Sequence, residues 1–413
     1  MMMKKTYTII ISVLVILLFS LLWAGTTETV KRERAVLRQG PGSFFPAVAE
    51  LAQGTSVEVR DQTDGWLKVT VEELSGYISS KAVEGQTKKQ DPFAQLSEKT
   101  SVTRVSRSGV SAAVKGFAER FATRLDGDTS FLDVLYSYHM DPAAYQRFRE
   151  ETYRRRNLRA IRRRVNIPRK KVPEVFSFSE EGVGLAIATK VAELGIYSNK
   201  PVQDYVNYVG NLVVEATDAY DIGFKFFILD SDKVNAYSCP GGIVFVSRGA
   251  LQRMDNEAEL ACFLGHEVAH VVLRHGMREM EKRRPMVTAD NAFMDLDNQV
   301  QMSPEMQAAN QDLESMALDA YETIFHGRLE GYEEEADTYG MIYAARAGYN
   351  PQAMATYLAK LSRGGQLSGN EHYTPQQNTK RLTTVKKWLQ HERMPNRLLE
   401  YNADRFHRWV HTL

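Results

Sequence analysis

The chain has 413 residues, and since a single core seldom grows beyond about 250 residues, this length predicts more than one domain. Its 52 basic and 51 acidic residues leave a net charge of +1, which argues against nucleic acid as a partner because it offers no broad attraction to a polyanion. The two cysteines, Cys239 and Cys262, exclude a disulfide framework and a cysteine-ligated zinc site, and leave open either one bridge or two buried thiols.

Residues 1–25 have the pattern of an export signal. Lys4 and Lys5 precede an uncharged apolar run from Ile9 to Ala24. Sixteen residues of helix span about 24 Å, slightly less than the hydrocarbon core of roughly 30 Å, which favours a cleaved signal peptide over a membrane anchor. Basic residues on both sides of the run are also compatible with a membrane anchor, which stays an alternative. In either case we expect the protein to work in the periplasm or at the extracytoplasmic face of the membrane.

Residues 30–84 predict a small barrel. Apolar residues alternate with polar ones in short runs that glycines interrupt, which is typical of short strands. The stretches "LRQGPGSFFPAVAELAQGTSVEV", "DGWLKV" and "GYISSKAV" resemble the bacterial SH3-like (Src-homology-3 type) barrel. In exported proteins this resemblance implies a cell-wall or peptide ligand, and a role as a mere spacer is an equally compatible interpretation.

The following segments predict a polar linker, residues 85–100, and a helical connector, residues 101–174. The connector ends in a basic stretch, residues 154–171, with ten basic residues and no acidic one. A helix here carries an apolar stripe, formed by Leu158, Ile161 and Val165. Such a helix can lie on a membrane surface or an acidic partner, but we favour a helix whose stripe packs inward and whose basic face is solvated.

The stretch "GHEVAHVVLRHG", residues 265–276, predicts a metal site on a helix. The helix begins at Asn256, which is followed by Glu259 as in a capping box. His266 and His270 are four residues apart, so they lie on one helical face and can bind a single tetrahedral ion.

Glu267 follows the first histidine and points about 100° around the helix. From there it can accept a proton from a water that zinc has made acidic, so the spacing suits hydrolysis. The five-residue HExxH pattern arises by accident in roughly one such chain in a hundred. The motif is therefore good but incomplete evidence for a zinc hydrolase.

A catalytic zinc ion normally takes three protein ligands. Glu333, in "GYEEEADTYGMIYAARAGYNP", is one candidate for the third, and residue type and spacing place it only modestly ahead of Glu334 and Glu335. Asp337 lies four residues after Glu333 and could accept a hydrogen bond from a liganding histidine. His275 is another candidate, on a different side of the first helix.

Four motifs in order, "NAYSCPGGIVFVSRGAL", "HEVAHVVLRHG", "EEEADTYG" and "AGYNP", resemble the HtpX/BepA-like and CAAX prenyl protease type of zinc metallopeptidase, a branch of the gluzincins. The resemblance covers roughly residues 183–389. It implies one zinc ion per chain, bound by His266, His270 and Glu333. It also implies Glu267 as the general base and Asp337 as the residue that orients a ligand.

The same resemblance implies that residues 235–246 form an edge strand beside the cleft. Val244, Phe245 and Val246 would then pair with an extended substrate backbone. These three residues are also ordinary strand formers, so a purely structural strand is a competing interpretation.

One segment departs from the family pattern. Thr374, in "HYTPQQNTKRL", stands where members of the family often carry histidine, and Arg381 lies one residue further on than usual. His372 could substitute as a transition-state donor or a fourth ligand, although a surface histidine is the favoured interpretation.

Residues 283–325 form a long polar segment, and since long loops in compact domains are often lids or disordered, we expect a lid over the cleft or a disordered loop. The segment has no membrane-length apolar run, so we expect the catalytic domain to be soluble. The chain as a whole predicts an α+β multidomain protein: a small all-β barrel, a helical connector and, from residue 175 to 413, a mostly α zincin-type metalloprotease domain with a short sheet. The leading hypothesis is an exported zinc-dependent endopeptidase, and the resemblance implies misfolded or unassembled envelope proteins as substrates. The alternatives are a zinc-stabilised binding scaffold or chaperone and a cell-wall-directed hydrolase.

Overall fold

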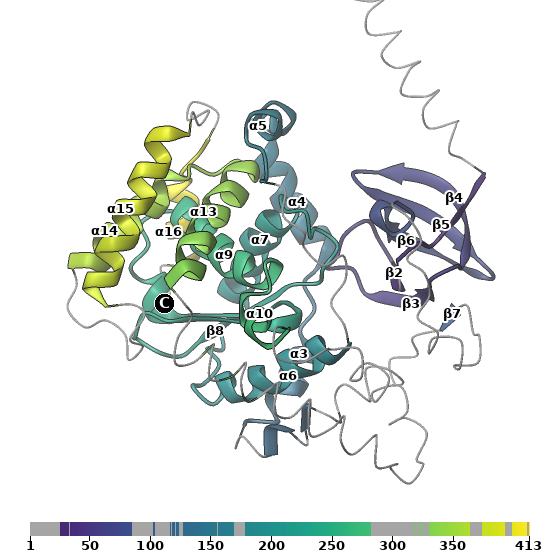
Figure 1. Cartoon of the computed structure of the whole chain (residues 1–413), viewed down its shortest axis with the longest axis horizontal. Coiled ribbons are helices and arrows are strands. Elements are labelled where there is room, and N and C mark those ends of the chain that lie inside the picture. Colours follow the sequence, from purple (N-terminus) through teal and green to yellow (C-terminus); the bar gives the residue numbers. More distant parts are fainter. Residues whose placement is uncertain are drawn as a thin grey trace, which may run out of the picture. The chain divides into compact units, whose positions relative to one another are not determined.

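The computed structural model divides the chain into two compact units, Met1–Gly109 and Val110–Leu413 (Figure 1). The described residues are 25–32, 34–84, 102–103, 116, 118–119, 121–123, 127–154, 156–168, 178–281, 318, 321, 324, 330–363, 374–392, 399–410 and 413. The predicted export signal and the linker at 85–100 therefore lie outside the described residues, apart from Gly25. None of the helices in the described part of the chain combines the length and the hydropathy needed to cross a bilayer.

The described part of the first unit is all β, as the sequence predicts. Its strands pair antiparallel in the order β1-β4-β5-β6-β2-β3-β7. The elements are β1 (Thr26–Thr29), β2 (Arg34–Arg38), β3 (Ala47–Ala52), β4 (Ser56–Thr63), β5 (Trp66–Val71), β6 (Leu74–Ser79), a 3₁₀ turn η1 (Ser80–Ala82) and β7 (Val102–Thr103).

Local sequence explains the hairpin between β4 and β5. Asp64 and Gly65 both have positive φ, 44° and 85°, which a two-residue turn with the twist of the flanking strands requires. Alternate residues then point inward, so that Val57 and Val59 of β4 and Leu67 and Val69 of β5 are fully buried.

Strand β7 changes one predicted boundary. Val102 and Thr103 pair with Leu51 and Glu50 of β3. Two residues that the sequence places at the start of the helical connector therefore extend the sheet of the first unit, because backbone pairing outweighs the weak helical pattern there.

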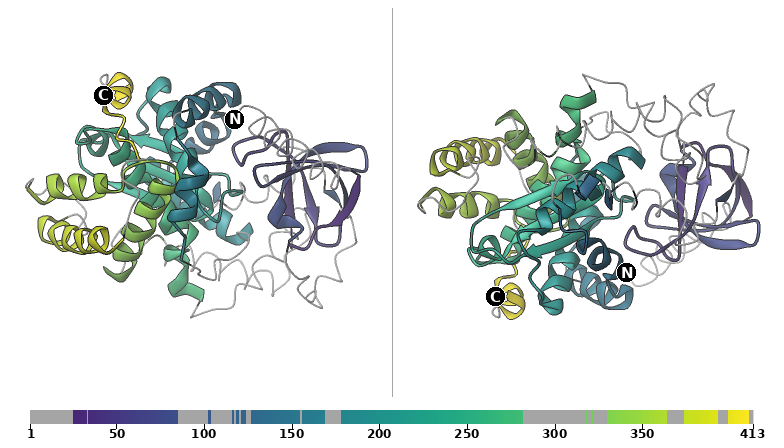
Figure 2. Two further views of the ribbon diagram at one scale, coloured as in Figure 1. Left: turned by 90° about the horizontal axis from the view of Figure 1, so that it is seen from above. Right: turned by 90° about the horizontal axis from the view of Figure 1, so that it is seen from below.

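The described part of the second unit is mostly helical and contains a three-stranded sheet. Helices α14 and α15 lie side by side (Figures 1 and 2). The elements are α3 (Phe131–Ser137), α4 (Pro142–Tyr153), α5 (Leu158–Arg164), α6 (Phe178–Ala192), α7 (Lys200–Val214), β8 (Lys225–Leu229), β9 (Ala236–Cys239), η3 (Pro240–Gly242), β10 (Ile243–Ser247), α8 (Arg248–Leu251), α9 (Glu257–Val272), α10 (His275–Glu281), α13 (Glu330–Arg346), α14 (Gln352–Arg363), α15 (Pro375–His391) and α16 (Ala403–Val410).

The basic helix α5 packs its apolar stripe inward. Ile161 and Val165 are buried, and the Arg346 guanidinium of α13 donates to the carbonyl oxygens of Arg162 and Val165. The stripe that a membrane surface would need is therefore used inside the unit, which agrees with the favoured interpretation.

The order of the small sheet corrects the prediction for Val244, Phe245 and Val246. Strand β10 lies in the centre of the order β8-β10-β9. All three residues pair with β8 on one side and with β9 on the other, so their backbone groups are used by the sheet. The predicted stretch, residues 235–246, contains two strands: β9, which is the edge facing away from β8 within the described residues, and most of β10. The choice of Val244, Phe245 and Val246 as edge residues was therefore wrong.

Helix α9 forms the centre of the second unit. All sixteen of its residues are buried, and the Asn256 side chain accepts the backbone N–H of Glu259 at 3.0 Å, as the capping pattern predicts. Cys262 on α9 and Cys239 on β9 are buried free thiols, which decides between the two possibilities for the cysteines.

Candidate metal centre

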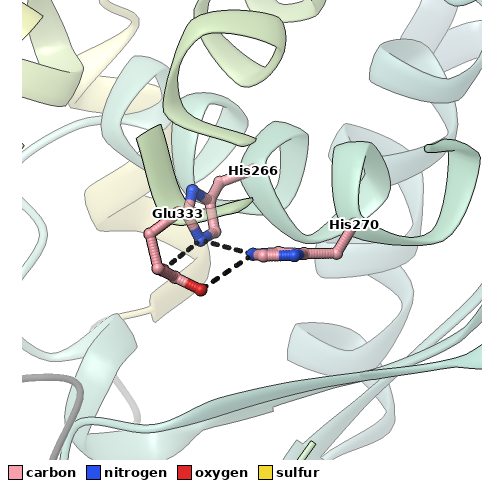
Figure 3. A group of neighbouring side chains, drawn as sticks. All are labelled: His266, His270 and Glu333. Carbon is pink, nitrogen blue, oxygen red and sulfur yellow. Dashed lines mark hydrogen bonds and ion pairs between the residues drawn. The ribbon is translucent and has the colours of Figure 1, made fainter. Parts of the chain in front are cut away.

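Two histidines of α9 and one glutamate of α13 converge (Figure 3). The Nε2 atoms of His266 and His270 lie 3.1 Å apart. Glu333 places Oε2 3.3 Å from His266 Nε2 and Oε1 3.3 Å from His270 Nε2. All three side chains are buried, and among the described residues they form the one group of this kind that could hold a metal ion.

Two glycines allow the helices to come this close. A Cβ atom on Gly340 of α13 would lie 2.6 Å from the backbone nitrogen of His266, and one on Gly265 of α9 would lie 2.7 Å from the carbonyl oxygen of Gly340. Since real Cβ atoms do not approach backbone so closely, any side chain at either position would push α13 away from α9. The paired glycines thus bring Glu333 within reach of the histidines.

The spacing of the three donors fits zinc. Zinc binds histidine nitrogen and carboxylate oxygen at about 2.0–2.2 Å in a tetrahedron, whose corners then lie about 3.3–3.6 Å apart. The observed separations of 3.1, 3.3 and 3.3 Å come close to this value. Two imidazoles and one carboxylate also leave a fourth position for water or substrate, as catalytic zinc sites do.

Glu267 lies beside this group. Its side chain is fully buried, and its Oε1 lies 3.9 Å from His266 Nε2. The carboxylate is therefore too far away to replace Glu333 as a donor at the same point, but close enough to contact a water molecule held there.

The His266 ring is held from its other side. Its Nδ1 lies 2.9 Å from Asp337 Oδ1, and Arg381 of α15 donates to both Asp337 oxygens, at 2.8 Å through Nε and 2.6 Å through Nη2. A metal-binding histidine commonly donates its second N–H to a carboxylate in this way. Arg381 Nη1 also lies 3.5 Å from Glu333 Oε2, so one guanidinium contacts both carboxylates.

These contacts shift the pKa values of His266, Asp337 and Glu333. Burial opposes the charged form of each group, but the surrounding charges outweigh it. Hydrogen bonds to Asp337 and Glu333 raise the pKa of His266 to about 9 against the effects of burial and of the Arg381 charge. The Arg381 charge lowers the pKa of Asp337, and the two histidines lower the pKa of Glu333. Both carboxyls are thus anionic: Glu333 can bind a cation, and Asp337 can accept the hydrogen bond from His266.

The structure distinguishes the remaining candidates. Glu334 lies 3.5 Å from the Thr384 hydroxyl, and Glu335 contacts His275, so neither carboxylate joins Glu333. His275 approaches the Nδ1 side of His270 and not its Nε2. His372 lies outside the described residues, and Thr374 caps α15 by accepting the backbone N–H of Gln377.

Most of the segment 283–325 also lies outside the described residues, so the lid stays a prediction. Within it, Ile324 packs against the hydrophobic cluster that includes α6 and β9. Sequence reasoning missed the role of Gly340; the only signal for it was a small residue seven positions after the candidate ligand Glu333.

Comparisons with known proteins agree with this geometry. Residues 202–389 match "Peptidase family M48", and residues 33–84 match "Bacterial SH3 domain". The chain is 32% identical over 158 residues to the beta-barrel assembly-enhancing protease of Yersinia pestis and 29% identical over 157 residues to that of Escherichia coli strain K12. Each match covers 38% of this chain and 32% of the relative, so the chain spans about a third of the length of these relatives.

A more distant relative is a mitochondrial metalloendopeptidase. The chain is 26% identical over 199 residues to the mitochondrial metalloendopeptidase OMA1 of Schizosaccharomyces pombe, which covers 46% of this chain and 54% of that protein. These relatives confirm the BepA-like part of the resemblance, since BepA is a beta-barrel assembly-enhancing protease. The finer placement in the HtpX and CAAX prenyl protease branch was wrong, because the relatives named here are assembly-enhancing proteases and an OMA1 protein. The second unit of the chain therefore carries a domain of peptidase family M48, and the first unit a bacterial SH3 domain.

Proposed function

We propose that the protein is an exported zinc-dependent endopeptidase. The observation that carries the proposal is the convergence of His266 Nε2, His270 Nε2 and the Glu333 carboxylate, with Glu267 Oε1 3.9 Å from the first nitrogen. A site with a purely structural zinc ion has no need of a second, buried carboxylate at that distance from a ligand atom. This argues against the alternative of a zinc-stabilised scaffold.

Each residue then has a defined task. His266, His270 and Glu333 would hold the ion, and zinc, when bound, polarises a carbonyl and lowers the pKa of water. Glu267 accepts the proton of the attacking water and returns it to the departing amine nitrogen, as general base and then general acid. Asp337 and Arg381 keep the His266 ring in place and support the anionic form of Glu333.

The substrate backbone would add to β9. This strand lies at the edge of the three-stranded sheet, and it packs against α9, which carries the site. Strand addition uses backbone hydrogen bonds and therefore accepts many side-chain sequences. Such a mode suits unfolded polypeptides as substrates.

Substrate class and location are proposed from the relatives. A beta-barrel assembly-enhancing protease is, by its name, concerned with the assembly of barrel proteins. We propose by analogy that this chain cuts misfolded or unassembled proteins of the cell envelope, in the periplasm or at the outer face of the membrane. The apolar run at residues 9–24 supports export.

The decisive experiment is zinc analysis combined with a casein-type cleavage assay on the wild type and on Glu267→Gln. Both should contain close to one zinc ion per chain, and the variant should lose about 100-fold to 10,000-fold in cleavage rate because it has no general base. Glu334→Gln, a change of the same kind on α13, serves as the control and should cleave normally.

Equal cleavage by the wild type and Glu267→Gln contradicts the assignment of the base. Parallel incubation with peptidoglycan fragments tests the cell-wall alternative suggested by the SH3 domain: release of soluble fragments, without casein cleavage, would replace the peptidase proposal.

A further inference from the structure

His275 occupies a buried position behind the candidate ligand His270. It is the first residue of α10 and is fully buried. Its Nδ1 lies 2.9 Å from His270 Nδ1, and its Nε2 lies 3.2 Å from Glu335 Oε2 on α13. Arg278 donates to the same Glu335 oxygen at 2.9 Å. The four side chains form a continuous chain that begins at His270.

The hydrogen-bonding roles in this chain follow from one constraint. If His270 Nε2 binds a metal, its lone pair is used there, so in the neutral ring the proton sits on Nδ1. That N–H must donate to His275 Nδ1, which then has no proton of its own. The proton of neutral His275 is therefore on Nε2, where it donates to Glu335. Every member has a consistent role, and both rings stay neutral.

Packing holds the His275 ring in the required plane. The ring stacks on Tyr332 of α13, with centroids 4.6 Å apart and planes inclined by 10°. Arg278 lies over the other ring of this pair, 5.7 Å from the Tyr332 centroid. Tyr332 and Glu335 flank Glu333 in sequence, so the helix that supplies the third ligand also supplies the support for the second.

We propose that His275 is a positioning residue that orients His270 for metal binding, with Glu335 and Arg278 completing its support. The proposal rests on the proposed zinc site. On the His266 side a carboxylate and an arginine play this part directly, through Asp337 and Arg381. On the His270 side a second carboxylate–arginine pair, Glu335 and Arg278, acts through the additional imidazole of His275.

The test is zinc affinity, measured on the full chain by competition with a chromophoric chelator. His275→Phe keeps an aromatic ring for Tyr332 but removes the acceptor, and should weaken zinc binding about 10-fold to 100-fold. His275→Asn keeps an oxygen acceptor near the position of Nδ1 and should recover most of that loss. The visible spectrum of the cobalt-substituted protein should change for the Phe variant and return towards the wild type for the Asn variant.

Glu335→Gln tests the outer part of the chain without altering the core imidazoles. We expect a loss of zinc affinity smaller than 10-fold, because a neutral amide oxygen still accepts the His275 proton. Glu334→Gln is the matched control on the next residue and should bind zinc within twofold of the wild type.

A zinc affinity of His275→Phe equal to the wild type overturns the proposal, as does an equal loss for Phe and Asn, which would indicate packing alone. If the Phe variant does not fold, nitrogen NMR of the zinc-loaded wild type decides: a proton on His275 Nε2 supports the proposal, and a proton on its Nδ1 overturns it. If the wild type binds no zinc, both the proposed function and this inference are wrong. If the wild type binds zinc and the variants bind it equally well, only this inference is wrong.

Discussion

In the described part of the first unit most buried side chains are aliphatic, whereas the second unit buries many carboxylic acids, histidines and arginines. Among the described residues, the sheet of the first unit has a core of valine, leucine, isoleucine and alanine, and its buried charged side chain is Arg32. In the described part of the second unit, the buried carboxylic acids, histidines and arginines are Glu180, Glu257, Glu259, His266, Glu267, His270, His275, Glu333, Asp337, Arg381 and Arg405.

The difference in buried residues indicates that the core of the first unit serves stability, whereas part of the buried interior of the second unit serves the proposed function. Burying an ionisable group costs free energy unless partners compensate it, and well-packed apolar residues of the same size often do better. Glu257 shows how fully such a group can be compensated: it accepts hydrogen bonds from Tyr205, Tyr349, Asn402 and Arg405. Most of these residues lie on α9 or on α10, α13 and α16, which contact it, and those of the proposed site lie in the second half of α9 and on α13.

The largest effect is expected where the two helices cross. Gly340→Ala places a Cβ atom 2.6 Å from the His266 backbone nitrogen, so α13 must shift and carry Glu333 away. A displacement of about 1 Å can cost 100-fold in rate, so we expect kcat/KM to fall by about that factor or more.

Gly331→Ala on the same helix is the control, because its added Cβ meets nothing within 4 Å. Comparable kcat/KM values for Gly340→Ala and wild type would mean that the close crossing is unnecessary for the site.

The next effect concerns the support of His266. Asp337→Asn keeps the shape of the side chain but removes the charge that faces His266 and Arg381, and should weaken zinc binding about 10-fold to 100-fold. Chelator competition measures this. Asp232→Asn, a largely exposed partner of Arg248, should leave zinc affinity unchanged, and a similar loss in both variants would indicate a general effect of charge.

A third experiment addresses the aliphatic core directly. Leu37→Ala removes a fully buried side chain of β2 and should destabilise the first unit by about 2–5 kcal/mol in urea unfolding. We expect casein cleavage within twofold of the wild type, since every described residue of the proposed site belongs to the second unit. A parallel loss of cleavage would show that the peptidase depends on the SH3 domain.

The smallest effect is a pH dependence caused by Lys225. Burial lowers the pKa of this lysine to about 8, while its ammonium donates to the carbonyl oxygens of Leu135 and Tyr138. Below pH 8 both folded and unfolded chains carry the proton. From pH 8 towards the unfolded value of about 10.5 the unfolded chain binds more protons, so stability rises with pH.

Lys225→Met should remove this rise, which amounts to about 2 kcal/mol between pH 7 and 9.5. The measurement is the difference between wild-type and variant unfolding free energies at pH 7 and pH 9.5, on zinc-loaded protein. If the difference in unfolding free energy between wild type and variant is the same at pH 7 and pH 9.5, Lys225 has an ordinary pKa.

Local features of the fold were predictable because they depend on neighbours in sequence. The Asn256 cap, the four-residue spacing of His266 and His270 and the turn at Asp64 all involve residues within a few positions of one another. The strand β10 was misplaced for the opposite reason. A run such as Val244 to Val246 has the same apolar composition at the edge or in the centre of a sheet, and its place is decided by which distant strands pair with it.

By itself, the sequence determined the pair of imidazoles, the adjacent Glu267 and the existence of an apolar helix to carry them, because 3.6-residue periodicity sets where side chains point. Residue type and spacing did not decide among the three glutamates; the family resemblance implied Glu333, and only the tertiary structure gives the physical reason. Glu333 faces the imidazoles, Glu334 turns towards Thr384, and Glu335 reaches His275. That choice depends on which face of α13 meets α9. The face is set by the close contact of Gly265 with Gly340, two residues far apart in sequence whose missing side chains matter only once the helices cross.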